Sequence, residues 1–134
     1  MARVLFVCLH NAGRSQMSKA LFDSVVHGRH TSESSGSRGD PNGHVHPEVV
    51  EAMRELGVDL SDRKPQRLTR DQAERADVVV TMGCGDECPY IPGKRYLDWD
   101  LRDPKGLSLD QVRMIRDDIA RRVERLVDEL DNST

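Results

Sequence analysis

The most restrictive feature of this sequence is a buried strand that passes almost directly into a helix. Residues 4–7 are all apolar and rich in β-branched and aromatic side chains, which is typical of a strand buried on both faces. From about Ser15 the apolar residues recur at helical spacing, and Gly28 is placed to end that helix. Because a strand buried on both faces needs helices to cover it, the pattern predicts an α/β fold with a mostly parallel sheet.

The same alternation continues along the rest of the chain. Three further strands and three further helices are predicted: strands over 31–35, 77–81 and 94–98, and helices that begin at Pro47, after Thr69 and after Ser108. The last helix is the clearest, because its apolar residues advance by three or four while its opposite face carries Arg, Asp and Glu. The predicted architecture is a parallel sheet with helices on both faces.

Length and composition exclude several classes of function. The 134 residues, 37% of them hydrophobic, suit a single domain over residues 1–134. No apolar run reaches the length of a membrane span and no signal-peptide pattern is present, so we expect a cytoplasmic protein without a membrane partner. A net charge of −3 and an aromatic content of 4% argue against a nucleic-acid partner.

Candidate catalytic residues follow three of the predicted strands. In an open parallel sheet, sites form at the edge made by the carboxyl ends of the strands. Three segments leave those ends, beginning at Cys8, Met82 and Trp99. The first two contain all three cysteines, and the third is rich in aspartate. The topology therefore predicts that these segments converge.

The first of these segments has the features of an oxyanion-binding loop. Five residues separate Cys8 from Arg14, which lets the loop wrap around a tetrahedral oxyanion with successive backbone N–H groups pointing inward. Gly13 allows the tight curvature, and Arg14 can donate two parallel hydrogen bonds. The predicted oxyanion-binding residues are Leu9, His10, Asn11, Ala12, Gly13 and Arg14.

Cys8 stands at the base of this loop and is the candidate nucleophile. The dipoles that bind an anion also favour a thiolate over a thiol. Ser15 can hydrogen-bond that thiolate, and Asn11 can brace the loop. A buried structural cysteine beside a surface arginine is the simpler alternative, but the position between strand and helix favours catalysis. A nucleotide-binding loop is excluded, because no Gly-Lys-Ser/Thr closes the segment.

Cys84 and Cys88 form the second candidate group. If residues 84–88 make one helical turn, the two sulfurs share a face, and thiol–disulfide exchange with Cys8 becomes feasible. Glycines on both sides of Cys84 would let the segment move. Two incidental buried cysteines are the alternative. No metal site is expected, because neither this pair nor the five histidines matches a zinc pattern, and the histidines are expected to be solvated.

The third segment supplies a candidate general acid. An oxyanion that loses a hydroxyl or ester oxygen needs a proton donor, and a positioned carboxyl is the usual one. Asp98, Asp100 and Asp103 all follow the predicted strand at 94–98, and their positions alone do not choose among them.

Taken together, these motifs resemble a known family. The run from residue 4 to Cys8, the loop ending in Arg14, the Cys84/Cys88 segment and Asp103-Pro104 resemble the arsenate reductases of the low-molecular-weight protein tyrosine phosphatase fold. The resemblance implies a four-stranded parallel sheet flanked by helices and reduction of arsenate to arsenite in arsenic detoxification. It also implies thioredoxin as electron donor, no bound cofactor, a monomer, and phosphate or sulfate as competing oxyanions.

The resemblance also implies roles for individual residues. Cys8 matches the nucleophile and Arg14 the arginine that clamps the anion. Ser15 matches the hydroxyl that supports the thiolate, and Asn11 matches the asparagine that braces the loop. Asp103 matches the general acid, which resolves the choice that position left open.

The implied reaction is a relay of three cysteines. Cys8 attacks arsenate, Cys84 attacks Cys8 so that arsenite leaves, and Cys88 then attacks Cys84. The resulting Cys84–Cys88 disulfide is reduced by thioredoxin. Here these two cysteines are closer in sequence than in the best-known members.

Two departures bear on related activities, and alternatives stay open. Lys19 stands where some members use a glutamate to bind potassium, so no potassium site is predicted there. Lys105 stands where the phosphatase relatives carry a tyrosine, which argues against tyrosine phosphatase as the main activity. The alternatives are a phosphatase acting on small phosphoesters, an arsenate reductase that uses a low-molecular-weight thiol such as mycothiol or glutathione, and a non-catalytic oxyanion sensor.

Overall fold

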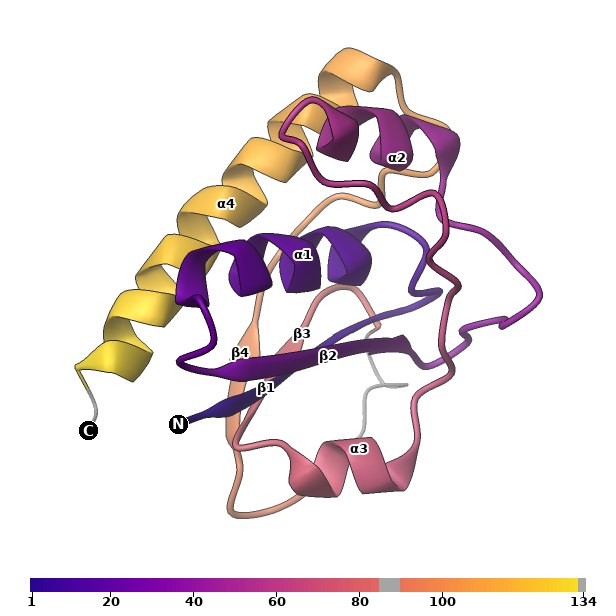
Figure 1. Ribbon diagram of the computed structural model, residues 1–134. Helices are drawn as coiled ribbons and strands as arrows, with labels where there is room; N and C mark the ends of the chain where they lie inside the picture. The colour runs from indigo at the N-terminus through magenta and orange to yellow at the C-terminus, as the bar shows by residue number, and fades with distance from the viewer. Residues whose placement is uncertain (85–89, 133–134) are drawn as a thin grey trace.

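A computed structural model describes residues 1–84 and 90–132, and within them it contains one parallel sheet. Its strands are β1 (Arg3–Cys8), β2 (Thr31–Gly36), β3 (Val78–Thr81) and β4 (Arg95–Asp98), in the order β2-β1-β3-β4 (Figure 1). Every neighbouring pair is parallel. The predicted four-stranded parallel sheet is confirmed, and the strands predicted over 31–35 and 94–98 are its edges.

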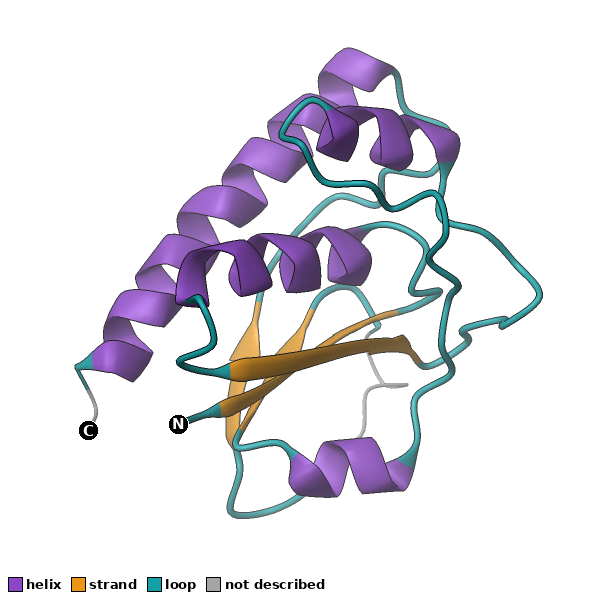
Figure 2. Ribbon diagram, viewed as in Figure 1, coloured by secondary structure: helices purple, strands orange, loops and turns teal. Residues whose placement is uncertain are grey.

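Helices cover both faces of this sheet (Figure 2). In the part of the chain that the structure describes they are α1 (Arg14–Val26), α2 (Pro47–Arg54), α3 (Arg70–Arg75) and α4 (Leu109–Asp131). Figure 1 shows α1, α2 and α4 on one face and α3 on the other. The alternation of strand and helix in the sequence therefore predicts the layers correctly.

The alternation of side chains along β1 divides the core into two clusters. Val4, Phe6 and Cys8 point into the larger cluster under α1, α2 and α4. Leu5 and Val7 point into a smaller cluster on the α3 side. Because β1 is central and buried on both faces, its last residue, Cys8, is held in a fixed position.

The helix ends follow from local sequence signals. Thr69 and Ser108 each form a capping box with the glutamine three residues on, and Pro47 is the first residue of α2. Helix α1 begins one residue earlier than the sequence pattern indicates, at Arg14. It ends at Val26 because His27, with a φ of 48°, already has the left-handed conformation that we expected at Gly28.

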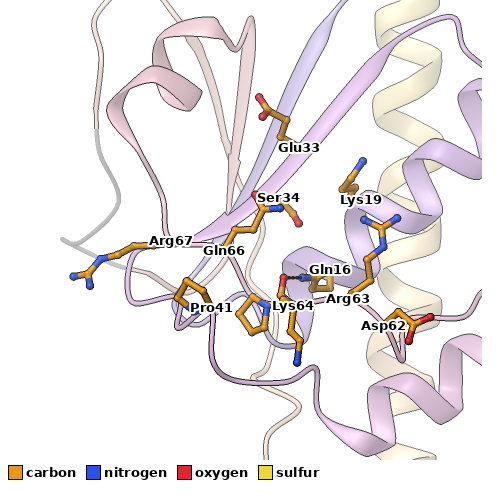
Figure 3. A pocket seen from close by; sticks show the side chains of 11 residues that line it. Gln16, Lys19, Glu33, Ser34, Pro41, Asp62, Arg63, Lys64, Gln66 and Arg67 are labelled. Atoms are coloured by element: carbon orange, nitrogen blue, oxygen red, sulfur yellow. Dashed lines mark hydrogen bonds between the residues drawn. The ribbon is translucent and has the colours of Figure 1, made fainter.

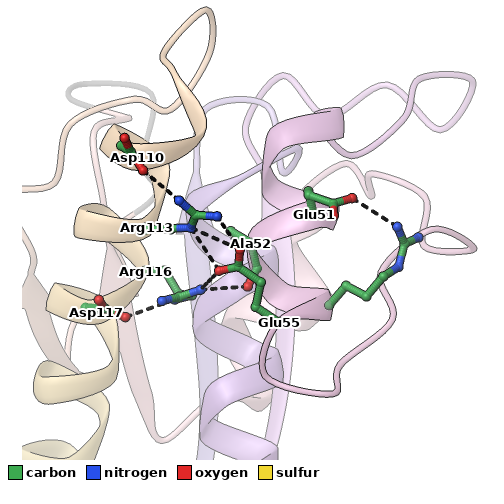
Figure 4. Close-up of polar contacts among 8 residues, drawn as sticks. Glu51, Ala52, Glu55, Asp110, Arg113, Arg116 and Asp117 are labelled. Atoms are coloured by element: carbon green, nitrogen blue, oxygen red, sulfur yellow. Dashed lines mark hydrogen bonds and ion pairs between the residues drawn. The ribbon is translucent and has the colours of Figure 1, made fainter.

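A group of charged side chains fixes α2 against α4 (Figure 4). Glu55 accepts hydrogen bonds from Arg113 and Arg116, and these lower its pKa from 4.5 to about 2. The buried Arg116 also donates to the carbonyl oxygen of Ala52 at 2.8 Å. These contacts hold the C-terminal end of α2 against α4.

Candidate active site

The loop between β1 and α1 surrounds the sulfur of Cys8 with hydrogen-bonding groups. Cys8 is a free thiol and only 2% exposed. Its Sγ lies 2.9 Å from Oγ of Ser15 and accepts a hydrogen bond from the backbone N–H of Asn11 at 3.3 Å. These contacts place donors where a thiolate would carry its charge. We call this loop, residues 8–14, the cradle.

Asn11 is the centre of the hydrogen bonds that hold the cradle. It is fully buried and has a left-handed φ of 55°. Its Nδ2 donates to Oγ of Ser15 at 2.6 Å, and its Oδ1 accepts from the backbone N–H of Gln66 at 2.8 Å and from Nε2 of Gln16 at 3.1 Å. Because Ser15 Oγ accepts a hydrogen bond from Asn11, its own hydroxyl proton can point at Cys8.

Arg14 brings the first and third segments together. It is 6% exposed, and its Nη1 donates to the carbonyl oxygen of Leu101 at 3.2 Å. Its Nη2 lies 3.7 Å from Oδ2 of Asp103, whose side chain is 44% exposed. The guanidinium therefore lies next to a carboxyl that solvent can reach.

The structure distinguishes the three candidate acids, which the sequence pattern alone does not. Asp103 lies beside Arg14. Asp98 accepts a hydrogen bond from the hydroxyl of Thr81 at 2.7 Å, and Asp100 is exposed. Among these three aspartates, Asp103 is therefore the one whose carboxylate lies beside the arginine of the cradle.

Gly13 allows the Asp103 segment to approach the cradle closely. A Cβ at Gly13 would lie 2.6 Å from Cγ of Pro104 and 3.5 Å from Cδ2 of His46. The two side chains therefore pack where a side chain of residue 13 would stand. This contact gives Gly13 a packing role in addition to the loop curvature that the sequence predicts.

The expectation that the histidines are solvated holds for His10, His27 and His44, which are exposed, but not for the other two. His46 is half-buried beside the cradle, and its backbone N–H donates to the carbonyl oxygen of Ala12 at 2.9 Å. Burial lowers the pKa of His46 below its ordinary value, and the charge of Asp103 opposes this shift. His30 is buried because it links the backbone N–H of Ala2 to the carboxylate of Asp131. Neither contact has a local sequence signal.

A cavity of about 610 Å³ lies behind the cradle (Figure 3). Gln16 connects the two, since its Nε2 donates both to Asn11 and to the carbonyl oxygen of Lys64. Lys19 also lines the cavity, and its ammonium donates to Asp23 at 2.7 Å and to the carbonyl oxygen of Ser32 at 3.1 Å. The absence of a potassium site at Lys19 stays a prediction.

Cys84 and Cys8 pack in different core clusters. Cys84 is 5% exposed and packs in the α3-side cluster with Leu5 and Val79, whereas Cys8 belongs to the cluster on the opposite face. Cys84 is disulfide-bonded in this structure, so this bond must be reduced before Cys84 can attack Cys8. Cys88 and the predicted helical turn of residues 84–88 lie outside the described residues, apart from Cys84 itself.

Within the described residues, no three or more His, Cys, Asp or Glu side chains are grouped to hold a metal ion. Nor is any helix in that part of the chain long and apolar enough to cross a membrane.

Comparison with known proteins identifies relatives over nearly the whole chain. Residues 3–134 match the family described as low molecular weight phosphotyrosine protein phosphatase. A Halobacterium salinarum protein, provisionally named as an arsenate reductase, is 45% identical over 129 residues, which are 92% of this chain and 89% of that protein. The "Glutaredoxin arsenate reductase" of Synechocystis is 33% identical over 130 residues, covering 95% of this chain and 97% of that protein.

Solved structures show the same fold. A thioredoxin-dependent arsenate reductase of Corynebacterium glutamicum superposes with a TM-score of 0.83 at 39% identity. All of this chain is matched there, but the chain spans only 63% of the length of that structure. An arginine phosphatase from Geobacillus stearothermophilus superposes with a TM-score of 0.88 at 23% identity, covering 98% of this chain and 94% of that one.

Proposed function

The chain belongs to the low molecular weight phosphotyrosine protein phosphatase family, and on this basis we propose that it is an arsenate reductase. The observation that carries the proposal is the cradle, in which Cys8 accepts hydrogen bonds while Arg14 lies beside Asp103. The names of the Halobacterium, Synechocystis and Corynebacterium relatives support arsenate as the substrate.

The first chemical step uses the cradle and Asp103. The thiolate of Cys8 attacks arsenic, with the backbone N–H groups of the loop and Arg14 stabilising the negative charge on the other oxygens. Asp103 donates its proton to the oxygen that leaves, so water departs and a sulfur–arsenic bond remains. The 44% exposure of the Asp103 side chain allows it to regain a proton from solvent.

The second part is the transfer of two electrons from thiols to arsenic. Cys84 attacks the sulfur of Cys8, the sulfur–arsenic bond breaks, and its electron pair stays on arsenic, which leaves as arsenite. Cys88 then attacks Cys84 and releases Cys8 as a thiolate. Thioredoxin reduces the Cys84–Cys88 disulfide by the same exchange. Because Cys84 is packed on the α3 side, the step at Cys8 requires Cys84 to leave its apolar surroundings.

A phosphatase acting on small phosphoesters is the second candidate. Cys8, Arg14 and Asp103 suffice for that chemistry, since it needs a nucleophile, an anion clamp and an acid but no second thiol. Lys105 stands at the exposed mouth of the site, where an aromatic side chain would be expected to grip an aryl phosphate. This favours a small inorganic oxyanion over an aryl ester.

The names of the relatives point to two different reductants. The Corynebacterium neighbour is described as thioredoxin-dependent, whereas the Synechocystis relative carries glutaredoxin in its name. We favour thioredoxin, because this chain has the three thiols that an internal relay needs.

A coupled assay tests the proposal. Oxidation of NADPH is followed with arsenate, thioredoxin and thioredoxin reductase, beside hydrolysis of an aryl phosphate by the same preparation. Rapid, arsenate-dependent oxidation with slow ester hydrolysis supports the reductase. Efficient ester hydrolysis that persists in the Cys84→Ser, Cys88→Ser variant would support the phosphatase instead. Activity only with glutathione or mycothiol would replace thioredoxin as the donor.

A further inference from the structure

Gly83, which links β3 to Cys84, lies directly against the guanidinium of Arg14. Its φ of +81° is in the left-handed region that favours glycine. A Cβ at this position would overlap Nη1 of Arg14 and would lie 3.1 Å from Cζ and 3.4 Å from Nη2. The end of the guanidinium therefore occupies the space that any side chain at residue 83 would need.

The other glycines with positive φ lack such a contact. Besides Gly83, the described residues include four glycines with positive φ, and a Cβ on any of these would meet no atom within 4 Å: Gly28, Gly57, Gly93 and Gly106. Backbone conformation alone thus accounts for glycine at those four positions. At Gly83 there is an additional steric requirement, and the group that imposes it is the anion clamp.

The guanidinium of Arg14 needs contacts on several sides to be held in place. An arginine side chain has considerable rotamer freedom, so a well-placed guanidinium must be fixed by its surroundings. The carbonyl oxygen of Leu101 fixes Nη1 at 3.2 Å, and the carboxylate of Asp103 lies 3.7 Å from Nη2. Both contacts come from the loop after β4. Gly83 adds a contact from the loop after β3.

We propose that Gly83 is a positioning residue for the oxyanion site. Because it has no side chain, it leaves the space in which the guanidinium of Arg14 is held to clamp the anion. A Cβ at residue 83 would push the guanidinium aside, since the end of a flexible side chain yields more readily than backbone. Arg14 would then lose its hydrogen bond to Leu101 and its aim at the anion. The proposal rests on the proposed function only in needing the cradle to bind an oxyanion.

The test measures binding of inorganic phosphate by calorimetry, which requires no turnover. Gly83→Ala and Gly83→Asn both add a Cβ, but asparagine adopts a positive φ at lower cost, so it separates collision from backbone strain. Because a charge-assisted hydrogen bond to the anion would be lost, both variants should bind phosphate about tenfold more weakly or worse. Gly93→Ala and Gly93→Asn are the matched controls and should change the affinity less than about twofold.

The same substitution made in an Arg14→Lys variant tests whether Gly83 acts through Arg14. Arg14→Lys removes the guanidinium, so adding Gly83→Asn to it should weaken phosphate binding less than about twofold further. Equal losses in both backgrounds would overturn the proposal, as would unchanged affinity of a folded Gly83→Asn variant, or no phosphate binding by the unsubstituted chain. Because the readout is phosphate affinity, it stays decisive even if arsenate reduction fails. Failure of the reductase assay with normal phosphate binding would overturn the proposed function alone.

Discussion

The substitution Asn11→Asp tests whether the hydroxyl of Ser15 donates to the sulfur of Cys8. In the structure Asn11 Nδ2 donates to Ser15 Oγ at 2.6 Å, which leaves the Ser15 proton free to point at Sγ of Cys8, 2.9 Å away. Aspartate keeps the acceptor for the backbone N–H of Gln66 but replaces the Nδ2 donor with a second acceptor. The Ser15 hydroxyl should then turn from the sulfur to the new carboxylate.

The expected effect that identifies the hydrogen bond is on the reactivity of Cys8. A hydrogen bond to a charged group contributes about 1.5–3 kcal/mol, and its loss should reduce the population of reactive thiolate about tenfold or more. The new negative charge adds to this effect by repelling the thiolate. The backbone N–H of Asn11 still donates to Sγ at 3.3 Å, so reactivity should fall without disappearing.

The assay is the rate of alkylation of Cys8 by iodoacetamide at neutral pH, followed by mass spectrometry of the peptide that carries it. The control is Asn42→Asp, which adds the same charge in an exposed loop and should change the rate less than about twofold. Circular dichroism checks that both variants fold. An alkylation rate equal to that of the unsubstituted chain, in a folded Asn11→Asp variant, would refute the assigned direction of the Ser15 hydrogen bond.

Three further substitutions probe the relay, the cradle packing and the helix contacts. Cys84→Ser should stop arsenate reduction while phosphate affinity, measured by calorimetry, stays unchanged, and loss of phosphate binding would contradict this. Gly13→Ala should lower both kcat and the thermal midpoint, because its Cβ would lie 2.6 Å from Cγ of Pro104 and overpacking costs about 1–3 kcal/mol. Hydrogen bonds from Arg113, and to a smaller extent from Arg116, lower the pKa of Glu55 from 4.5 to about 2. The stability that these contacts contribute is therefore present above pH 4.5 and is lost as the pH falls through about 2. Glu55→Gln should therefore flatten the acid side of the plot of thermal midpoint against pH, and an unchanged slope would show that the contact adds nothing.

The elements of the fold could be predicted because their signals are local. The apolar run in β1, the proline that opens α2 and the capping boxes of α3 and α4 each identify an element within a few residues. Strand β2 gave a weaker signal, since its sequence is mostly serine and polar residues. It lies at an edge of the sheet, where β1 is its neighbouring strand and Gly36 at its end also bridges to Arg67, and this edge position explains why it lacks an apolar pattern.

The cradle could also be predicted, but its long-range contacts could not. Cys8, Asn11, Arg14 and Ser15 lie within eight residues, so their spacing shows what they can do together. Gly83 approaches Arg14 from a distant part of the chain, and no local pattern reports that contact. The same holds for the selection of an acid among three aspartates and for the burial of His30, which depend on tertiary packing.

The relay is tested most directly by the disulfide that remains after one turnover. The reduced protein is mixed with arsenate in the absence of thioredoxin, quenched with a thiol-blocking reagent, digested and examined by mass spectrometry. The proposed relay predicts one arsenite released per chain, a Cys84–Cys88 disulfide and a blocked, reduced Cys8. Recovery of arsenite with Cys84 and Cys88 both blocked as free thiols would contradict it.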